Sequence, residues 1–212
     1  MGIIAEKMLA AGILTHEGRD VLKEESSKVR KLLRKTAWEI SILRERPILF
    51  ERVKDKNGVP MRIVLSADKI KVEQEHEDKP PFSVLDVSIL MEDLAGNPIG
   101  KWHLDRANGG QSGPLFHLQF GGHHPAFRDR EFPVKEPRWC HPPMELALLC
   151  EMISANFFEA KWAEFLRDDP AWCGAIRIFQ ELCYQAYAKR LSESLNASHS
   201  TALGKMWNDR WI

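Results

Sequence analysis

The feature that most constrains the fold is a series of short apolar runs separated by turn signals between Pro47 and Gly122. The pair Asn57-Gly58 is typical of a tight β-hairpin. Residues 69–75 alternate charged residues with isoleucine and valine, which is the pattern of a half-buried strand. Similar runs follow at 84–91, 99–105 and 114–120. Because their connections are short, we predict an antiparallel β-meander of five or six strands over residues 47–122.

The segments on both sides of this sheet are predicted to be helical. In residues 1–46 we expect a short helix over 3–11 and a long helix from His16 to Leu43, which Thr15 caps and Pro47 ends. The long helix is inferred from apolar positions at spacings of three, four and seven, namely Leu22, Val29, Leu33, Thr36, Ile40 and Leu43. Residues 144–195 are predicted helical too, with a second start at Asp168-Asp169-Pro170.

The whole chain, residues 1–212, is expected to form one α+β domain. Residues 123–143 are expected to be an irregular loop and residues 196–212 a polar tail. Two or three C-terminal helices should pack on the apolar face of the sheet. That face is predicted to consist of Val87, Ile89, Trp102, Leu104, Phe116, Leu118 and Phe120.

The charge balance bears on the class of partner. Thirty basic residues offset thirty acidic ones, so the formal net charge is zero. A neutral chain has no global attraction to nucleic acid or to anionic membranes, which makes nucleic acid a disfavoured partner. We see neither a signal-peptide pattern nor an apolar run long enough to span a bilayer. The four cysteines form no CxxC pair, and we expect a cytoplasmic protein with reduced thiols.

Histidines concentrate in one segment of the chain, at positions 103, 117, 123, 124 and 141. If the 99–105/114–120 hairpin is centred on Gly110, His103 lies opposite His117. Alternation then places Asp86, Ser88, Lys101, Asp105 and Gln119 on the same face. Paired imidazoles can move protons or bind a phosphate. The candidate catalytic residues are therefore His103, His117, His124, Lys101 and Asp105, although a merely solvated sheet face explains the same pattern.

Three further groups of residues have alternative interpretations. Cys140 precedes a predicted helix start, where a helix dipole favours a thiolate nucleophile, but buried packing beside Trp139 is the favoured interpretation. A zinc site can be drawn from His103, His117, His124 and Cys140, but their spacing matches no known ligand pattern, so we assign no metal and expect no cofactor. Trp207 and Trp211, in the tail, either dock on the parent domain or bind a partner.

Three hypotheses for function follow. The first is a protein that acts through protein–protein interaction, as an accessory, immunity or antitoxin-like subunit or as a homo-oligomer, with Trp207 and Trp211 as partner-binding residues. The second is a small hydrolase, most concretely a metal-independent ribonuclease-like enzyme that uses His103 and His117 as acid and base. The third is a metal-dependent enzyme that uses the His/Cys segment 103–141. Whether the chain is an enzyme stays open at this point.

Overall fold

The computed structural model describes residues 1–32, 37–73, 80–108, 110–121 and 137–211. Within these ranges two helices come first, α1 (Gly2–Ala10) and α2 (His16–Leu32). Seven strands follow: β1 (Ala37–Ile42), β2 (Ile48–Lys54), β3 (Pro60–Glu73), β4 (Phe82–Asp93), β5 (Pro98–Arg106), β6 (Phe116–Phe120) and β7 (Trp139–Cys140). The rest is helical: α4 (Leu146–Phe157), α5 (Glu159–Phe165), α6 (Pro170–Leu195), α7 (Ala202–Lys205) and the 3-10 turn η1 (Asn208–Arg210).

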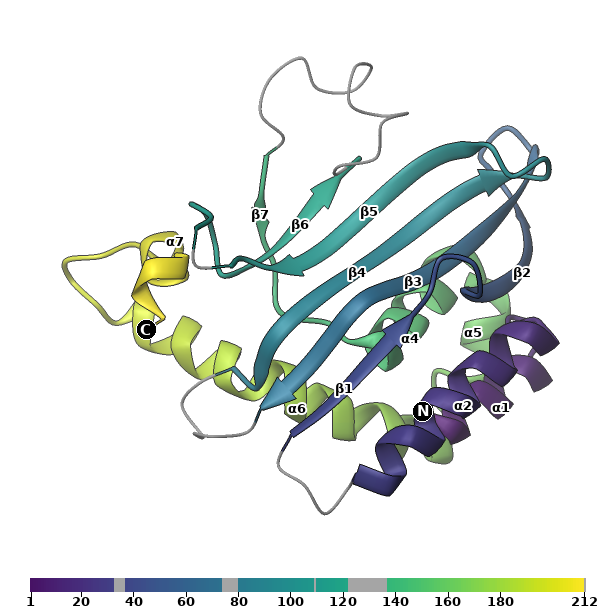
Figure 1. The fold of residues 1–212 in the computed structure, drawn as a ribbon, viewed down its shortest axis with the longest axis horizontal. Helices are drawn as coiled ribbons and strands as arrows, with labels where there is room; N and C mark the ends of the chain where they lie inside the picture. The colour runs from purple at the N-terminus through teal and green to yellow at the C-terminus, as the bar shows by residue number, and fades with distance from the viewer. Residues whose placement is uncertain (33–36, 74–79, 109, 122–136, 212) are drawn as a thin grey trace.

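All seven strands belong to one antiparallel sheet, which confirms the predicted α+β class (Figure 1). The strands β3 to β7 are neighbours in chain order. The long strand β3 pairs with β4 on one side and with both β1 and β2 on the other. Strand β3 covers both the return strand of the Asn57-Gly58 hairpin and, as far as Glu73, the run predicted at 69–75, and it carries a bulge between Ala67 and Lys69. The count exceeds the predicted five or six because β1 and β7 were not expected.

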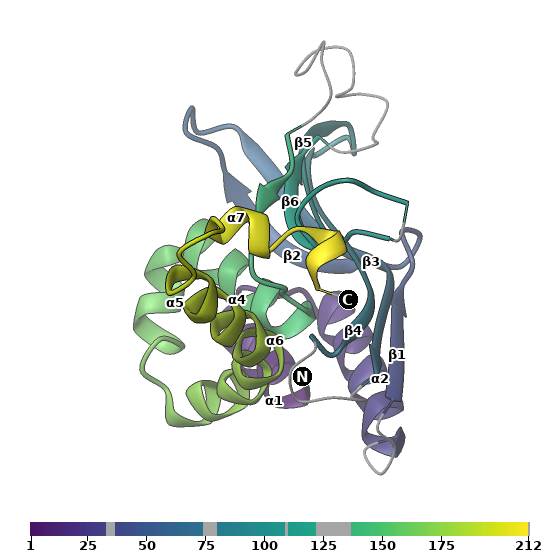
Figure 2. The same cartoon turned by 90° about the vertical axis from the view of Figure 1, so that its left-hand side faces the viewer.

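The helices pack on the apolar face of the sheet, as predicted. Figure 2 shows α1, α4, α5 and α6 on one side of the strands. Val87, Ile89 and Leu104 of the sheet share one core with Leu149 and Trp172 of the helices. Toward β6 this face is less covered, since Leu118 is only partly buried and 38% of Phe120 is exposed. Among the described residues, no helix combines the length and the apolar character needed to cross a bilayer.

The predicted long helix from His16 to Leu43 is wrong in its second half. Thr15 does cap α2, because its Oγ1 accepts a hydrogen bond from the Gly18 N–H at 3.0 Å. The helix, however, ends at Leu32, and residues 37–42 form strand β1. Ile40 and Ile42 are buried while Leu43, assigned to the helical stripe, is 63% exposed. The period of two in this segment overrides the apparent helical spacing, because β3 offers it a pairing edge.

The helices α4 and α6 begin at acidic caps. Asp169 accepts a hydrogen bond from the Trp172 N–H at 2.8 Å and Pro170 opens α6, as predicted. The start of α4 lies later than the expected Pro142-Pro143, because the buried Glu145 is its N-cap. Glu145 Oε1 accepts hydrogen bonds from the N–H groups of Ala147 and Leu148 at 2.7 and 3.0 Å.

Candidate functional site

The polar face of β4, β5 and β6 carries the histidines, but the predicted register of its last hairpin is wrong. Asp105 pairs with Asp86 and His103 with Ser88, as expected. On the other side His103 lies opposite Gln119, and His117 lies opposite Asp105 rather than His103. The ladder is set by the Ala107 N–H, which donates to Leu115 O at 2.7 Å and centres the turn beyond Gly110. The observed register differs from the predicted one by two residues. Because side chains alternate with a period of two, each still lies on its predicted face.

This polar face is buried where it carries the histidines. It is therefore not the solvated sheet face that would also explain the sequence pattern. Exposed fractions are 1% for His117, 3% for Gln119, 7% for His103 and 8% for Lys101. Buried ionisable groups are costly unless they are paired. The partners of these groups therefore decide what the face can do.

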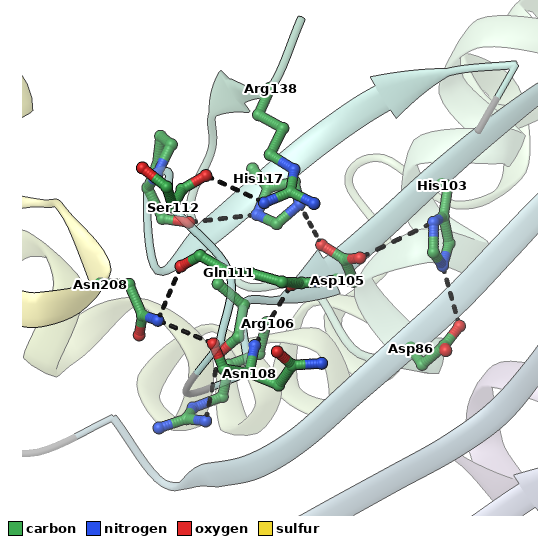
Figure 3. Close-up of polar contacts among 12 residues, drawn as sticks. Asp86, His103, Asp105, Arg106, Asn108, Gln111, Ser112, His117, Arg138 and Asn208 are labelled. Atoms are coloured by element: carbon green, nitrogen blue, oxygen red, sulfur yellow. Dashed lines mark hydrogen bonds and ion pairs between the residues drawn. The ribbon is translucent and has the colours of Figure 1, made fainter. Parts of the chain in front are cut away.

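Two aspartates and two histidines alternate across three strands, and we call this set the Asp/His row (Asp86, His103, Asp105 and His117; Figure 3). His103 Nε2 lies 2.8 Å from Asp86 Oδ1 and its Nδ1 lies 3.8 Å from Asp105 Oδ2. His117 Nε2 is in ion-pair contact with Asp105 Oδ1, and neither atom has a hydrogen-bond partner among the described residues. His117 Nδ1 lies 3.1 Å from Pro114 O.

Asp86, the most exposed member of the row, has a pKa that is shifted by its neighbours. Burial acts to raise the pKa of Asp86, but the hydrogen bond from His103 and the nearby positive charges of Lys101 and Arg44 lower this pKa below its ordinary value. Asp86 is 39% exposed in its side chain, whereas that of His117 is fully buried. The row thus runs from the surface into the sheet.

Imidazoles oriented by carboxylates can serve in acid–base chemistry, but here each ring nitrogen faces an oxygen of the protein itself. A substrate would need one nitrogen to turn away from Asp86, Asp105 or Pro114. In this arrangement the ring nitrogens of both histidines contact oxygens of the protein and leave none directed at a substrate.

The structure brings four of the five predicted catalytic residues together, namely Lys101, His103, Asp105 and His117, while His124 lies outside the described residues. The predicted set lacked Asp86, although its place beside Asp105 was expected. It also lacked Arg138, whose Nη1 donates to Ser112 O at 3.0 Å in the connection between β5 and β6 (Figure 3). Arg138 is far from Ser112 in sequence, and the pairing of β6 with β7 brings the two segments together.

Cys140 lies opposite His117 in the β6–β7 ladder, but its thiol does not join the Asp/His row. Cys140 Sγ lies 3.2 Å from Tyr187 Oη of α6. Burial and this contact raise the pKa of Tyr187. The expected helix dipole is absent at Cys140, because α4 starts only at Leu146. Within the described ranges no group of three or more His, Cys, Asp or Glu side chains is placed to bind a metal ion.

A second feature of this region is an apolar edge, formed by Trp102, Leu118, Phe120, Trp139 and Phe157. The Trp102 ring lies 6.2 Å from that of Phe120 and 5.8 Å from that of Phe157. Trp139, on the short strand β7, pairs with Leu118 and is 60% exposed. An exposed tryptophan beside an exposed phenylalanine is typical of a contact surface.

The two tail tryptophans contact the chain itself. Trp207 forms an isolated bridge with Pro114. Trp211 packs against Phe116 and Tyr187, with ring centres 6.3 and 6.5 Å apart, and Arg190 lies over its ring. Of the two placements expected from the sequence, the structure has the docked one, and a role of both residues in partner binding stays a prediction.

Comparisons of the chain with protein-family models, with curated proteins and with solved structures find no match.

Proposed function

We propose that this chain acts in the cytoplasm through protein–protein interaction, with the apolar edge as its contact surface. The observation that carries the proposal is the 60% exposure of Trp139 on the outermost strand of the sheet, next to the exposed Phe120. Tryptophan is the residue type most enriched among those that dominate binding energy at interfaces. The four free cysteines fit a reducing compartment.

The histidines support this proposal indirectly. A catalytic imidazole needs one nitrogen directed at the substrate. In the Asp/His row the nitrogens are directed at Asp86, Asp105 and Pro114 O, and both rings are buried. The accessible chemistry of the region is therefore apolar and aromatic.

Site-specific photocrosslinking tests the proposal. A photoreactive phenylalanine analogue replaces Trp139 in one variant and Ile178 in another, and both are expressed in the native host. Ile178 is a matched control, because it is 64% exposed but lies on α6. We expect a discrete crosslinked protein from position 139 alone. No adduct from position 139, or the same adducts from both positions, would contradict the proposal.

A small hydrolase remains the second candidate function, and the Asp86–His103 pair favours it. A carboxylate that orients an imidazole is the arrangement of a general base, and His103 Nδ1 has no hydrogen-bond partner among the described residues. A phosphodiesterase assay on RNA would decide this. Activity that both His103→Ala and His117→Ala abolish while the fold is retained would favour the enzyme over the interaction protein.

A further inference from the structure

Beyond partner binding, we propose that Asp105 and His117 share a proton that fastens the C-terminal tail to the sheet, so that a rise in pH releases the tail. We call this pair the proton clasp.

The contacts of the two ring nitrogens of His117 require one proton more than a neutral ring carries. The carbonyl of Pro114 can only accept, so His117 Nδ1 at 3.1 Å must donate. If the ring is neutral, Nε2 then presents a lone pair to Asp105 Oδ1, with which it is in close contact. Two lone pairs repel, and the side chain of His117 is fully buried from water. One proton between Nε2 and Oδ1, on either atom, removes the conflict.

His103 has no such requirement. Its Nε2 donates to Asp86 Oδ1 at 2.8 Å in the neutral form of the ring. Its Nδ1 lies 3.8 Å from Asp105 Oδ2, which is too far for a hydrogen bond. An extra proton is therefore required between Asp105 and His117 but not between Asp86 and His103. The Asp86–His103 pair can serve as a control.

The other charged and titratable groups around the clasp come from four strands and from the segment before β7. They are Lys69 on β3, which pairs with Glu39 at 3.0 Å, Asp86 on β4, Lys101 and His103 on β5, Arg138 before β7 and Cys140 on β7. Asp105 Oδ1 is in direct contact with His117 Nε2, so its charge acts most strongly on the protonation of that nitrogen.

The clasp is connected to the tail through the segment 113–116. Pro114 receives the hydrogen bond of His117 and bridges to Trp207. On either side of it, Gly113 O accepts from the Asn208 N–H and the Leu115 N–H donates to Met206 O, each at 2.9 Å. Phe116 then packs against Trp211. After the proton is lost, the neutral ring has a single N–H and cannot donate to both Pro114 O and Asp105. One of the two contacts is then lost, which weakens the hold of segment 113–116 on the tail.

Fluorine NMR on protein labelled with 5-fluorotryptophan tests the clasp, with Trp207 and Trp211 assigned by single substitutions to Phe. In the wild-type protein we expect both signals to shift together as the pH is raised from about 5 to about 8. In Asp105→Asn the amide can donate to a neutral Nε2, so both signals should stay at their low-pH positions. Asp86→Asn is the matched control, because the Asp86 carboxylate is hydrogen-bonded to His103 rather than to His117, and the tail signals of this variant should still shift.

Two results would overturn the clasp. One is a wild-type tail whose signals do not change across this range, and the other is a transition that Asp105→Asn retains. If Asp105→Asn does not fold, nitrogen NMR of ¹⁵N-histidine in the wild-type protein replaces it. Both ring nitrogens of His117 should carry protons at low pH, and the loss of one should coincide with the tail transition. A His117 proton that leaves without any movement of the tail contradicts the proposal. Crosslinking at position 139 is independent of either outcome.

Discussion

At the scale of single residues, Glu145 is the most unusual buried group after the histidines. It is 0% exposed, and its Oε1 caps α4 while its Oε2 has no hydrogen-bond partner among the described residues. Burial raises the pKa of Glu145 to about 7, against the opposing effect of the two helix N–H groups. The folded protein therefore binds this proton more tightly than the unfolded chain does.

We therefore predict that the free energy of unfolding depends on pH through Glu145, and that Glu145→Gln removes this dependence. Because the folded pKa lies above the ordinary 4.5, the stabilisation by the protonated group is complete below that value and is lost as the pH rises to about 7. At about 1.4 kcal/mol per pKa unit the wild-type protein should lose on the order of 3 kcal/mol. Urea denaturation of the two proteins at pH 4.5 and pH 7.5 measures this loss. An unchanged loss in Glu145→Gln would be inconsistent with it.

Asp169→Asn is the control for this prediction, because Asp169 caps α6 at the other helix start. The hydrogen bonds from Lys7 and from the Trp172 N–H lower the pKa of Asp169. Its contribution is therefore present above pH 3.8 and is lost only in more acidic solution, so this variant should retain the wild-type loss between pH 4.5 and 7.5.

Sequence reasoning at this scale could find which face each residue occupies but not which partner it meets. Alternation places His103, Asp105 and His117 on one side of the sheet whatever the loop does. The partner of His117 depends on how the glycine-containing turn closes, and here the Ala107–Leu115 hydrogen bond decides it. Glu145 escaped prediction because a buried glutamate is unusual as a cap and Pro142-Pro143 resembles an earlier helix start.

At the scale of elements, α2 meets the sheet through a glycine. A Cβ on Gly18 would lie 2.3 Å from Leu49 O and 2.9 Å from Leu49 N, both atoms of the β2 backbone. Thr15 fixes this approach, since its Oγ1 donates to Leu49 O at 3.0 Å. The first turn of α2 thus rests directly on β2, and only glycine fits there.

We therefore predict that Gly18→Ala destabilises the protein by about 1 to 3 kcal/mol, as overpacking of a core does. Gly174→Ala provides the matched comparison, because Gly174 lies in α6 with no atom within 4 Å of an added Cβ. Alanine there should stabilise by about 0.5 to 1 kcal/mol through its helix propensity. Chemical denaturation of both variants measures the difference. Equal effects would mean that α2 and β2 are farther apart than described.

The helix-to-strand error in residues 37–42 shows the limit of local patterns. Ile40 fits a helical stripe with Leu43 and a strand face with Ile42, so the sequence supports both interpretations. The choice is made by β3, because its residues 67–73 present a free edge that β1 fills. Such long-range pairing has no local sequence signal.

At the scale of the whole molecule, the tail connects the helix α6 to the start of β6 and to the segment before it. Besides the contacts of Trp207 and Trp211, Asn208 Nδ2 donates to the carbonyl oxygens of Asn108 and Gln111. The tail shows no period or motif that predicts this docking, and only its aromatic residues suggested a packed surface.

Replacement of Trp211 by Ala should destabilise the protein by about 2 kcal/mol, which is about half the loss at a fully buried tryptophan. Trp139→Ala, at the 60% exposed tryptophan of β7, should change stability by less than about 0.5 kcal/mol. The free energy of unfolding in urea distinguishes the two. Similar effects of both variants would show that the tail contributes no more than an exposed side chain.

The pairing of β3 with two strands on one edge also has a consequence for folding order. β2 reaches β3 through a hairpin that joins Lys54 to Pro60, whereas Ala37 of β1 pairs with Glu73. Contacts between near neighbours in the chain cost less loop-closure entropy than distant ones, so they form sooner. We therefore expect the β2–β3 hairpin to form first, and β1 to pair afterwards with the edge of β3 that this hairpin presents.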